Sequence, residues 1–232
     1  MRKLVIIPAY NEQGGIKKTV QDIQAHAPDF DYVVINDCST DDTLAVCRKN
    51  GFHVINLPVN LGIGGSVQTG YLYAYANGYD VAVQFDGDGQ HNAKYLDEMA
   101  DRLAKEKLDM VIGSRYIKKE GFQSSGMRRA GIRYFSGLIR LVTGKRITDP
   151  TSGMRMAGRS VIALYAKNYP KDYPEPESVT VALKKGKRVG EVPVQMNART
   201  EGISSISPRK SVYYMIKVSL AILIAAVRGE RV

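Results

Sequence analysis

Two carboxylates separated by a single glycine, Asp86 and Asp88, are the residues whose types and spacing point most directly to chemistry. They follow residues 81–85, an apolar run with the composition of a buried strand. Two carboxylates held side by side repel each other unless a positive charge lies between them. Oxygen ligands such as these two and the amide of Gln90 suit Mg²⁺ or Mn²⁺, which also bind phosphate oxygens. The segment therefore predicts a divalent-cation site at the end of a strand.

Two other interpretations of this segment compete with a cation site for phosphates. An Asp-Gly-Asp turn between a strand and a helix can serve only as turn chemistry and a helix N-cap. An EF-hand calcium loop beginning at Asp86 would place Asp97 at its twelfth position, but its sixth residue, normally glycine, is His91. The preceding segment also predicts a strand and not a helix. The calcium loop is therefore disfavoured, and the turn interpretation stays open.

Charge is distributed unevenly along the 232 residues, whose net charge is +10. Residues 1–100 contain 7 Lys and Arg against 12 Asp and Glu, whereas residues 101–232 contain 26 against 11. An acidic first part joined to a basic second part suggests a cation-binding region beside a surface that meets anions. Nucleic acid, phospholipid headgroups and a phosphorylated substrate all fit this pattern. Among the basic residues, Arg128, Arg140 and Arg146 are interpreted as parts of a solvated face.

The elements that must position the carboxylates alternate between strand and helix. Strands are predicted at residues 4–7, 32–35, 53–56, 81–85, 110–115 and 189–195, with a short strand after the turn at 149–155. Helices are predicted at 13–26, 93–105, 127–143 and 159–167, with one helix capped by Ser39 or Thr40 and another that opens within 60–66 and reaches 77. Residues 169–176 are expected to form a loop. The alternation predicts an α/β fold with a mostly parallel sheet and right-handed crossovers. Ligands bind at the carboxyl ends of the strands in such sheets.

Composition indicates one ordinary globular domain, because no Pro/Gly/Ser-rich linker divides the chain. Cys38 and Cys47 form no metal-ligand spacing and are expected to be reduced thiols of a cytosolic protein. Residues 1–3 lead directly into a strand, so no signal peptide is expected. Neither a dinucleotide glycine fingerprint nor a P-loop is present.

The C-terminal segment is strongly apolar. Between residues 212 and 227 only Lys217 and Ser219 are strongly polar. Sixteen helical residues extend roughly 24 Å, which is short of the roughly 30 Å hydrocarbon core of a bilayer. The segment could lie in a membrane interface, dock onto a membrane partner or pack as a core helix.

Six short motifs are weakly specific singly but informative in combination. They are Pro8-Ala9-Tyr10-Asn11-Glu12, Ile35-Asn36-Asp37-Cys38-Ser39-Thr40-Asp41, the glycines near Gly64, Asp86-Gly87-Asp88-Gly89-Gln90, Gly113-Ser114-Arg115-Tyr116 and Asp149-Pro150-Thr151-Ser152-Gly153. Over about residues 3–205 the chain resembles the nucleotide-sugar domain of inverting family 2 glycosyltransferases. It is similar to the polyprenyl-phosphate branch, which includes dolichyl-phosphate mannose synthase and bacterial undecaprenyl-phosphate sugar transferases.

The resemblance implies a fold and a set of site residues. The fold would be a GT-A type nucleotide-sugar-binding domain at residues 1–207, followed by a C-terminal apolar helix at 208–232. Catalysis would involve Asp86, Asp88 and Arg115, and metal binding Asp86, Asp88 and Gln90. The nucleotide sugar would contact Pro8, Tyr10, Asn11, Glu12, Ile35, Asp37, Gly64, Asp86, Gly87 and Asp88, with Ile35 and Asp37 at the base. An acceptor phosphate would contact Arg115, Arg129, Arg133 and Arg199.

The same resemblance implies partners. The donor would be a nucleotide sugar, with UDP favoured and GDP the alternative, and the cofactor Mg²⁺ or Mn²⁺. The acceptor would be a polyprenyl phosphate, reached from the cytoplasmic face of the cell membrane. A membrane surface or a small membrane protein would contact residues 208–232, and the chain could form a homo-oligomer. No nucleic acid partner is expected.

Departures from the family pattern and the positive charge of residues 101–232 keep two other functions open. The chain has Ile63-Gly64-Gly65 where related enzymes often carry lysine, and it has only a short apolar tail. One alternative is transfer to a sugar hydroxyl, a poor nucleophile that needs a carboxylate base such as Glu175 or Glu177. Both acids are otherwise interpreted as surface residues of the 169–176 loop and its end. The other alternative is a non-enzymatic basic protein that binds nucleic acid or anionic membrane.

Overall fold

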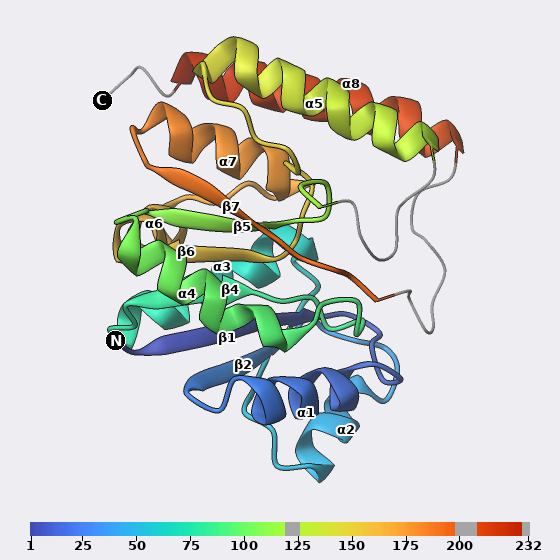
Figure 1. Ribbon diagram of the computed structural model, residues 1–232. Coiled ribbons are helices and arrows are strands. Elements are labelled where there is room, and N and C mark those ends of the chain that lie inside the picture. Colours follow the sequence, from blue (N-terminus) through green and yellow to red (C-terminus); the bar gives the residue numbers. More distant parts are fainter. Residues whose placement is uncertain (119–125, 198–207, 229–232) are drawn as a thin grey trace.

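A seven-stranded mixed sheet with helices on both faces forms the centre of the protein (Figure 1). The computed structural model describes residues 1–118, 126–197 and 208–228. The strands are β1 (Lys3–Ala9), β2 (Phe30–Asn36), β3 (Val54–Asn56), β4 (Val81–Gln84), β5 (Met110–Ser114), β6 (Arg155–Gly158) and β7 (Val189–Pro193). The helices are α1 (Ile16–His26), α2 (Thr43–Lys49), α3 (Gly62–Ala76), the 3₁₀ turn η1 (Ala93–Tyr95), α4 (Leu96–Lys105), α5 (Gly126–Thr143), α6 (Arg159–Lys167), α7 (Pro174–Lys184) and α8 (Pro208–Arg228).

The strand order is β3-β2-β1-β4-β6-β5-β7, and β6 alone runs antiparallel to its neighbours. The predicted mostly parallel α/β sheet is therefore confirmed. Its strands read as continuous apolar runs because both faces are covered. Along β1, Leu4 and Ile6 pack on the side of α3, while Val5 and Ile7 pack on the side of α1 and α4.

Helix α7 is the element that the sequence did not predict. Residues 174–176 were expected to be loop, but α7 begins at Pro174. Proline is tolerated in the first helical turn, because the backbone N–H groups there have no intrahelical partner. The acids between and after the prolines, Glu175 and Glu177, lie in the same turn, where the helix dipole favours negative charge. The expectation of an extended surface loop was therefore wrong.

The antiparallel strand β6 brings a buried arginine to the carboxyl edge of the sheet. Arg155 begins β6 and lies opposite Gln84 of β4 and Ile112 of β5. It is only 1% exposed. Its guanidinium donates to backbone oxygens of Pro150, Ser152 and Glu175 at 2.6, 2.6 and 2.5 Å and to Ser178 Oγ at 2.8 Å. One side chain thus ties the 149–153 turn, β6 and α7 together.

Helices α5 and α8 lie side by side as the outermost layer over α7 (Figure 1). The ring of Tyr214 in α8 packs at 5.7 Å from Phe135 in α5 and at 4.7 Å from Tyr173, measured between centroids. Lys217 of α8 donates to Asp172 at 2.7 Å. A helix is thus present at the predicted C-terminal position, and among the described residues none combines the length and hydropathy of a membrane span.

Gly64 lets the first turn of α3 approach the chain's own backbone. Its N–H donates to the oxygen of Lys171 at 3.1 Å. A β-carbon at this position would lie 2.1 Å from the oxygen of Pro170 and 2.3 Å from that of Lys171. The resemblance implies that Gly64 contacts the nucleotide sugar, but here its close neighbours are residues 170 and 171, which lead into α7.

Replacing Gly64 by alanine should destabilise the fold, because two backbone carbonyls must move to accept the methyl group. We expect the free energy of unfolding to fall by about 1–3 kcal/mol, the usual cost of overpacking. Gly137→Ala is the matched control: Gly137 is also helical, and a β-carbon there meets nothing within 4 Å. In Gly137→Ala the free energy of unfolding should rise by about 0.5–1 kcal/mol. Urea denaturation measures both, and equal effects would contradict the packing described.

Candidate active site

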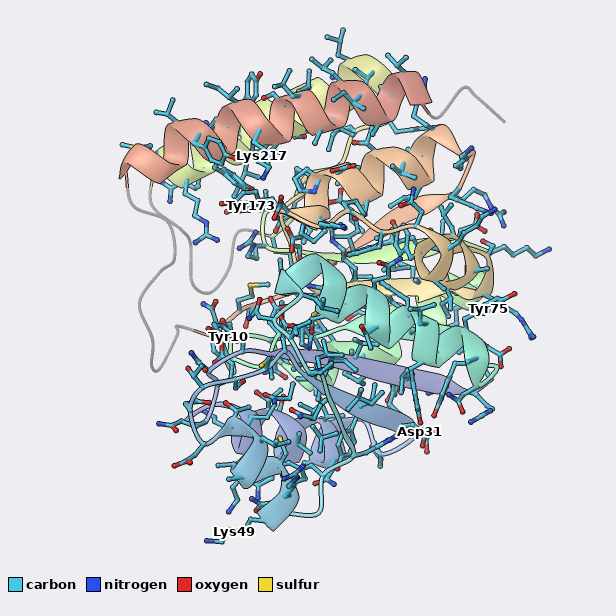
Figure 2. The ribbon with its side chains drawn as sticks, turned by 180° about the vertical axis from the view of Figure 1, so that it is seen from behind. Tyr10, Asp31, Lys49, Tyr75, Tyr173 and Lys217 are labelled. Atoms are coloured by element: carbon cyan, nitrogen blue, oxygen red, sulfur yellow. The ribbon has the colours of Figure 1, made fainter. Side chains whose placement is uncertain are left out.

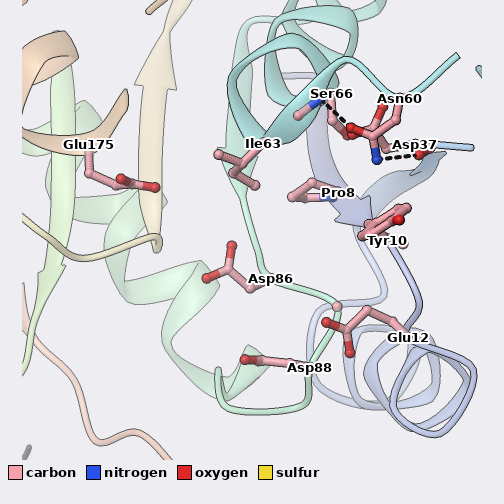
Figure 3. A pocket seen from close by; sticks show the side chains of 13 residues that line it. Pro8, Tyr10, Glu12, Asp37, Asn60, Ile63, Ser66, Asp86, Asp88 and Glu175 are labelled. Atoms are coloured by element: carbon pink, nitrogen blue, oxygen red, sulfur yellow. Dashed lines mark hydrogen bonds between the residues drawn. The ribbon is translucent and has the colours of Figure 1, made fainter. Parts of the chain in front are cut away.

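A cavity of about 380 Å³ lies at the carboxyl ends of β1, β2 and β4 (Figure 3). The strand order places β1 next to β4, and the connection that leaves β1 runs to β2 on one side whereas the connection that leaves β4 runs to β5 on the other. Such a switch point is where open α/β sheets bind ligands. The cavity is lined by Pro8, Ala9, Tyr10, Glu12, Asp37, Asn60, Gly62, Ile63, Ser66, Asp86, Gly87, Asp88 and Glu175.

Most of the predicted nucleotide-sugar residues meet at this cavity. Those that line it are Pro8, Tyr10, Glu12, Asp37, Asp86, Gly87 and Asp88. They come from the ends of three neighbouring parallel strands, which explains why residues up to 80 positions apart converge. The Asp37 Oδ1 atom accepts from the Leu61 N–H at 2.7 Å, so the loop into α3 is fixed at the same edge.

Three predicted residues lie outside the lining. Ile35 is completely buried in the core beneath α3, so it stands behind the cavity wall. Asn11 joins two loops, because its Oδ1 atom accepts from the Thr40 N–H at 2.9 Å. Gly64 is the third, since it packs against residues 170 and 171. All three support the cavity from outside its surface.

The carboxylate of Asp86 is held on several sides. Gln84 Nε2 donates to its Oδ1 at 3.2 Å, and His91 Nε2 lies 3.1 Å from its Oδ2. A β-carbon on Gly153 would lie 2.4 Å from the same Oδ2, so a side chain at this position would displace the carboxylate. Burial by itself raises the pKa of Asp86, but the hydrogen bond and charge of His91, the Gln84 hydrogen bond and the charge of Arg155 outweigh it and lower the pKa. The group is therefore charged at neutral pH and fixed in orientation.

Asp86 and Asp88 are the carboxylates that could hold a divalent cation with a diphosphate. Asp88 Oδ1 accepts from the backbone N–H of Gln90 at 3.0 Å. The side chain of Gln90 is not part of the cavity lining, so Gln90 fixes the turn through its backbone. Within the described residues no group of three or more His, Cys, Asp and Glu side chains could hold a metal ion alone. A carboxylate pair fits Mg²⁺ or Mn²⁺ where substrate phosphates supply further oxygens.

Several residues of the site were missed by sequence reasoning. Asn60, Ile63 and Ser66 line the cavity from the start of α3 and the loop before it. His91 and Arg155 lie behind the cavity. His91 contacts the carboxylate of Asp86, and Arg155 donates to the backbone of Glu175 in α7. The signals available were the glycine-rich segment 60–66 and the Pro-Glu-Pro-Glu run at 174–177.

Glu175 faces the cavity from α7, whereas Glu177 is not part of its lining. The interpretation of Glu175 as an ordinary surface acid was wrong. Burial raises the pKa of its carboxyl group, and the nearby charge of Asp86 raises it further, while the charge of Arg155 opposes the shift. Glu175 is therefore an acid held in a site that disfavours its charged form.

A second cavity, of about 480 Å³, lies beneath α5 and is rich in arginine. Its lining residues are Tyr116, Arg129, Ile132, Arg133, Ser136, Arg146 and Thr148. Two of the predicted acceptor arginines, Arg129 and Arg133, are thus brought together. Arg146 lines the same cavity and is exposed, which agrees with its interpretation as part of a solvated face. Arg128 and Arg140 are exposed on α5.

Arg115 lies outside both linings because its guanidinium is engaged by an aspartate. Its Nε and Nη2 atoms donate to Asp149 at 2.6 and 2.8 Å, and Nη2 also donates to Thr151 at 3.0 Å. Burial would lower the pKa of Arg115, but the hydrogen bond and charge of Asp149 raise it. The ion pair joins the end of β5 to the 149–153 turn. Arg199, the fourth predicted acceptor residue, lies outside the described residues.

Comparison with known proteins finds one family. The profile of Glycosyl transferase family 2 matches residues 4–164. The UDP-N-acetylglucosamine–dolichyl-phosphate N-acetylglucosaminyltransferase of Methanococcus voltae is 29% identical over 211 residues, covering 82% of this chain and 84% of that protein. The undecaprenyl-phosphate mannosyltransferase of Micrococcus luteus is 29% identical over 219 residues, covering 89% of this chain and 88% of that protein.

Solved structures share the fold. Glucosyl-3-phosphoglycerate synthase from Mycobacterium tuberculosis, in complex with phosphoglyceric acid, gives a TM-score of 0.76 at 19% identity, covering 97% of this chain and 80% of that one. The same synthase with Mn²⁺, UDP-glucose and phosphoglyceric acid gives a TM-score of 0.75 at 19% identity, covering 97% of this chain and 79% of that one. At this level of identity the likeness concerns the GT-A arrangement of sheet and helices.

The raised pKa of Glu175 predicts a stability cost that depends on pH. An acid whose pKa is higher in the folded than in the unfolded state stabilises the fold when protonated, and that contribution is lost as pH rises through the two values. The variant E175Q should therefore melt at a higher temperature than the wild type at pH 7.5, and the difference should shrink toward pH 4. Differential scanning calorimetry across that range measures it. A variant less stable than the wild type at pH 7.5 would contradict the burial described.

Proposed function

The chain belongs to glycosyl transferase family 2, and on this basis we propose that it transfers a sugar from a UDP-sugar to a polyprenyl phosphate with the help of Mg²⁺ or Mn²⁺. The observation that carries the proposal is the pair of cavities. One presents acidic residues at the carboxyl ends of the strands, and the other presents arginines beneath α5. A nucleotide diphosphate with its cation suits the first, and an anionic acceptor suits the second.

The donor side follows from the first cavity. Tyr10 and Asp37 would contact the nucleoside, with Pro8 and Glu12 beside them. Asp86 and Asp88 would hold the cation and, through it, the diphosphate. When bound there, a divalent cation supplies Lewis-acid stabilisation of the charge that develops on the leaving diphosphate. One relative whose name specifies UDP-N-acetylglucosamine, and a neighbour bound to UDP-glucose, support UDP over GDP.

The acceptor side follows from the second cavity. A lipid phosphate is already ionised near neutral pH, so it needs no general base to attack the sugar. It needs cations that position it and offset its repulsion from the diphosphate. Arg129 and Arg133 would do this, with Arg146 beside them. The names of the relatives from Methanococcus voltae and Micrococcus luteus, which specify dolichyl and undecaprenyl phosphate, support this acceptor class.

The outer helices would bring the enzyme to its lipid. Exposed apolar side chains recur along the outer helices α5 and α8, and Figure 2 shows side chains that project from α8 on the side away from Tyr173. They are Met127, Tyr134 and Leu141 of α5 and Val212, Tyr213, Ile216, Leu220, Leu223, Ile224 and Val227 of α8. Such a face, with arginines on α5, suits the interface of an anionic membrane. We therefore place the enzyme peripherally on the cytoplasmic face of the cell membrane, with residues 1–207 as the transferase domain.

A second candidate acceptor is a sugar hydroxyl. The observation that favours it is Glu175, a carboxylate in the cavity that could act as the general base a hydroxyl requires. The two candidates differ in the product, which is a lipid-linked sugar in one case and a water-soluble or polysaccharide-linked sugar in the other.

The transfer assay tests the proposal directly. The full chain is incubated with polyprenyl phosphate, Mg²⁺ or Mn²⁺ and radiolabelled UDP-sugars, and label is followed into organic solvent. We expect extraction of label that EDTA prevents and that Asp88→Asn lowers about 100-fold or more, since Lewis-acid stabilisation contributes several kcal/mol. Label transferred only to water-soluble saccharide would support the hydroxyl acceptor. A chain that binds RNA tightly but no nucleotide sugar would contradict both candidates.

Removing the arginines of the second cavity should affect the acceptor alone. Arg129→Ala and Arg133→Ala should each raise the KM for polyprenyl phosphate about 10-fold or more, the effect of losing a hydrogen bond to a charged group. The dissociation constant for UDP should stay the same. Arg140→Ala is the control, because Arg140 is exposed on the same helix and lines neither cavity. Equal shifts in all three variants would count against this assignment.

A further inference from the structure

Glu175 is the one lining residue of the first cavity that follows Asp88 in the part of the chain that the structure describes. All other lining residues belong to β1, to the loops that follow β1, β2 and β4, or to the start of α3 and the loop before it. Figure 3 shows Glu175 on one side of the cavity and Tyr10 and Asp37 on the other, with Asp86 between them. A separate element, α7, thus contributes one carboxylate to the side away from the proposed nucleoside contacts.

The backbone that carries Glu175 is held firmly. Its carbonyl oxygen accepts from Arg155 Nη1 at 2.5 Å and from Ser178 Oγ at 3.1 Å. Tyr173, two residues before Glu175, has a left-handed backbone conformation with φ of 50°. Pro174 and Pro176 flank Glu175 on either side. Prolines fix φ, so the first turn of α7 has little freedom. The carboxyl group is therefore presented to the cavity by a rigid support.

The order of groups along a nucleotide sugar fixes what reaches this side. With the nucleoside near Tyr10 and Asp37 and the diphosphate near Asp86 and Asp88, the hexose must extend toward Glu175. A carboxylate accepts hydrogen bonds at two oxygens and can bind two hydroxyl groups of one sugar ring. The ionised lipid phosphate has no use for a base, so the proposed acceptor leaves Glu175 without a role in proton transfer.

We propose that Glu175 binds hydroxyl groups of the donor hexose and thereby determines which UDP-sugar the enzyme uses. This inference rests on the proposed function, because it places a UDP-sugar in the first cavity. A site built to hydrogen-bond sugar hydroxyls rejects an epimer that leaves its buried polar group unpaired. The raised pKa of the carboxyl group fits this role, since a half-buried acid without its ligand is costly to ionise.

Binding measurements separate the sugar contact from the rest of the site. Isothermal titration calorimetry is carried out on the full chain in Mn²⁺ with UDP, UDP-glucose, UDP-galactose and UDP-N-acetylglucosamine. Glu175→Gln should weaken binding of the preferred UDP-sugar about 10-fold or more, while the dissociation constant for UDP changes less than about twofold. Glu177→Gln, in the same helical turn but outside the cavity lining, should change neither. Retained UDP binding shows that each variant is folded.

The remaining outcomes each decide the inference. Unchanged affinity of Glu175→Gln for every UDP-sugar overturns it, as does equal weakening for UDP and its sugars. Unchanged affinities with loss of transfer would make Glu175 a general base and also overturn it. If Glu175→Gln fails to fold, Glu175→Asp replaces it, and an unchanged ranking of the three UDP-sugars in that variant overturns the inference. A wild-type chain that binds UDP but none of the sugars overturns it together with the proposed function.

Discussion

Holding several carboxylates together at the end of a buried sheet is the constraint on which the rest of the structure depends. Glu12, Asp37, Asp86, Asp88 and Glu175 all line one cavity of about 380 Å³. Carboxylates that share one cavity destabilise one another unless opposite charge or hydrogen bonding compensates their negative charge. Arg155, buried and bonded to three carbonyls, lies behind the cavity, and His91 contacts Asp86. Burial is the main cause of the raised pKa of Glu175, and the charge of Asp86 adds to it. A cation bound among these carboxylates would offset their mutual repulsion.

The same constraint accounts for the uneven charge of the chain. Apart from Glu175, the acidic residues of the first cavity follow strands formed by residues 1–100. The arginines of the second cavity come from α5 and the segment after it. An enzyme that joins two anionic substrates must keep them apart until they react and must supply opposite charge to each. Helices α5, α7 and α8 pack on one another, so the element that carries Glu175 also touches the proposed lipid-facing layer.

The sequence predicts the position of a side chain well when that position depends only on where a strand ends. Pro8, Asp37 and Asp86 follow apolar strands, and parallel strands end at a common edge, so their convergence could be predicted. Prediction failed where position depends on contacts distant in sequence. The burial of Arg155 requires β6 to insert antiparallel between β4 and β5, and the engagement of Arg115 requires Asp149, 34 residues away. Helix α7 was missed because prolines disfavour helix interiors, although its first turn accommodates them.

The central claim is that Asp86 and Asp88 hold a divalent cation jointly with the diphosphate of the donor. Anomalous diffraction from crystals of the full chain soaked with MnCl₂ and UDP locates such a cation directly. The account predicts a manganese peak at the first cavity, about 2 Å from carboxylate oxygens of this pair and from diphosphate oxygens. A bound UDP whose diphosphate lies away from both aspartates, with no manganese beside them, would contradict it.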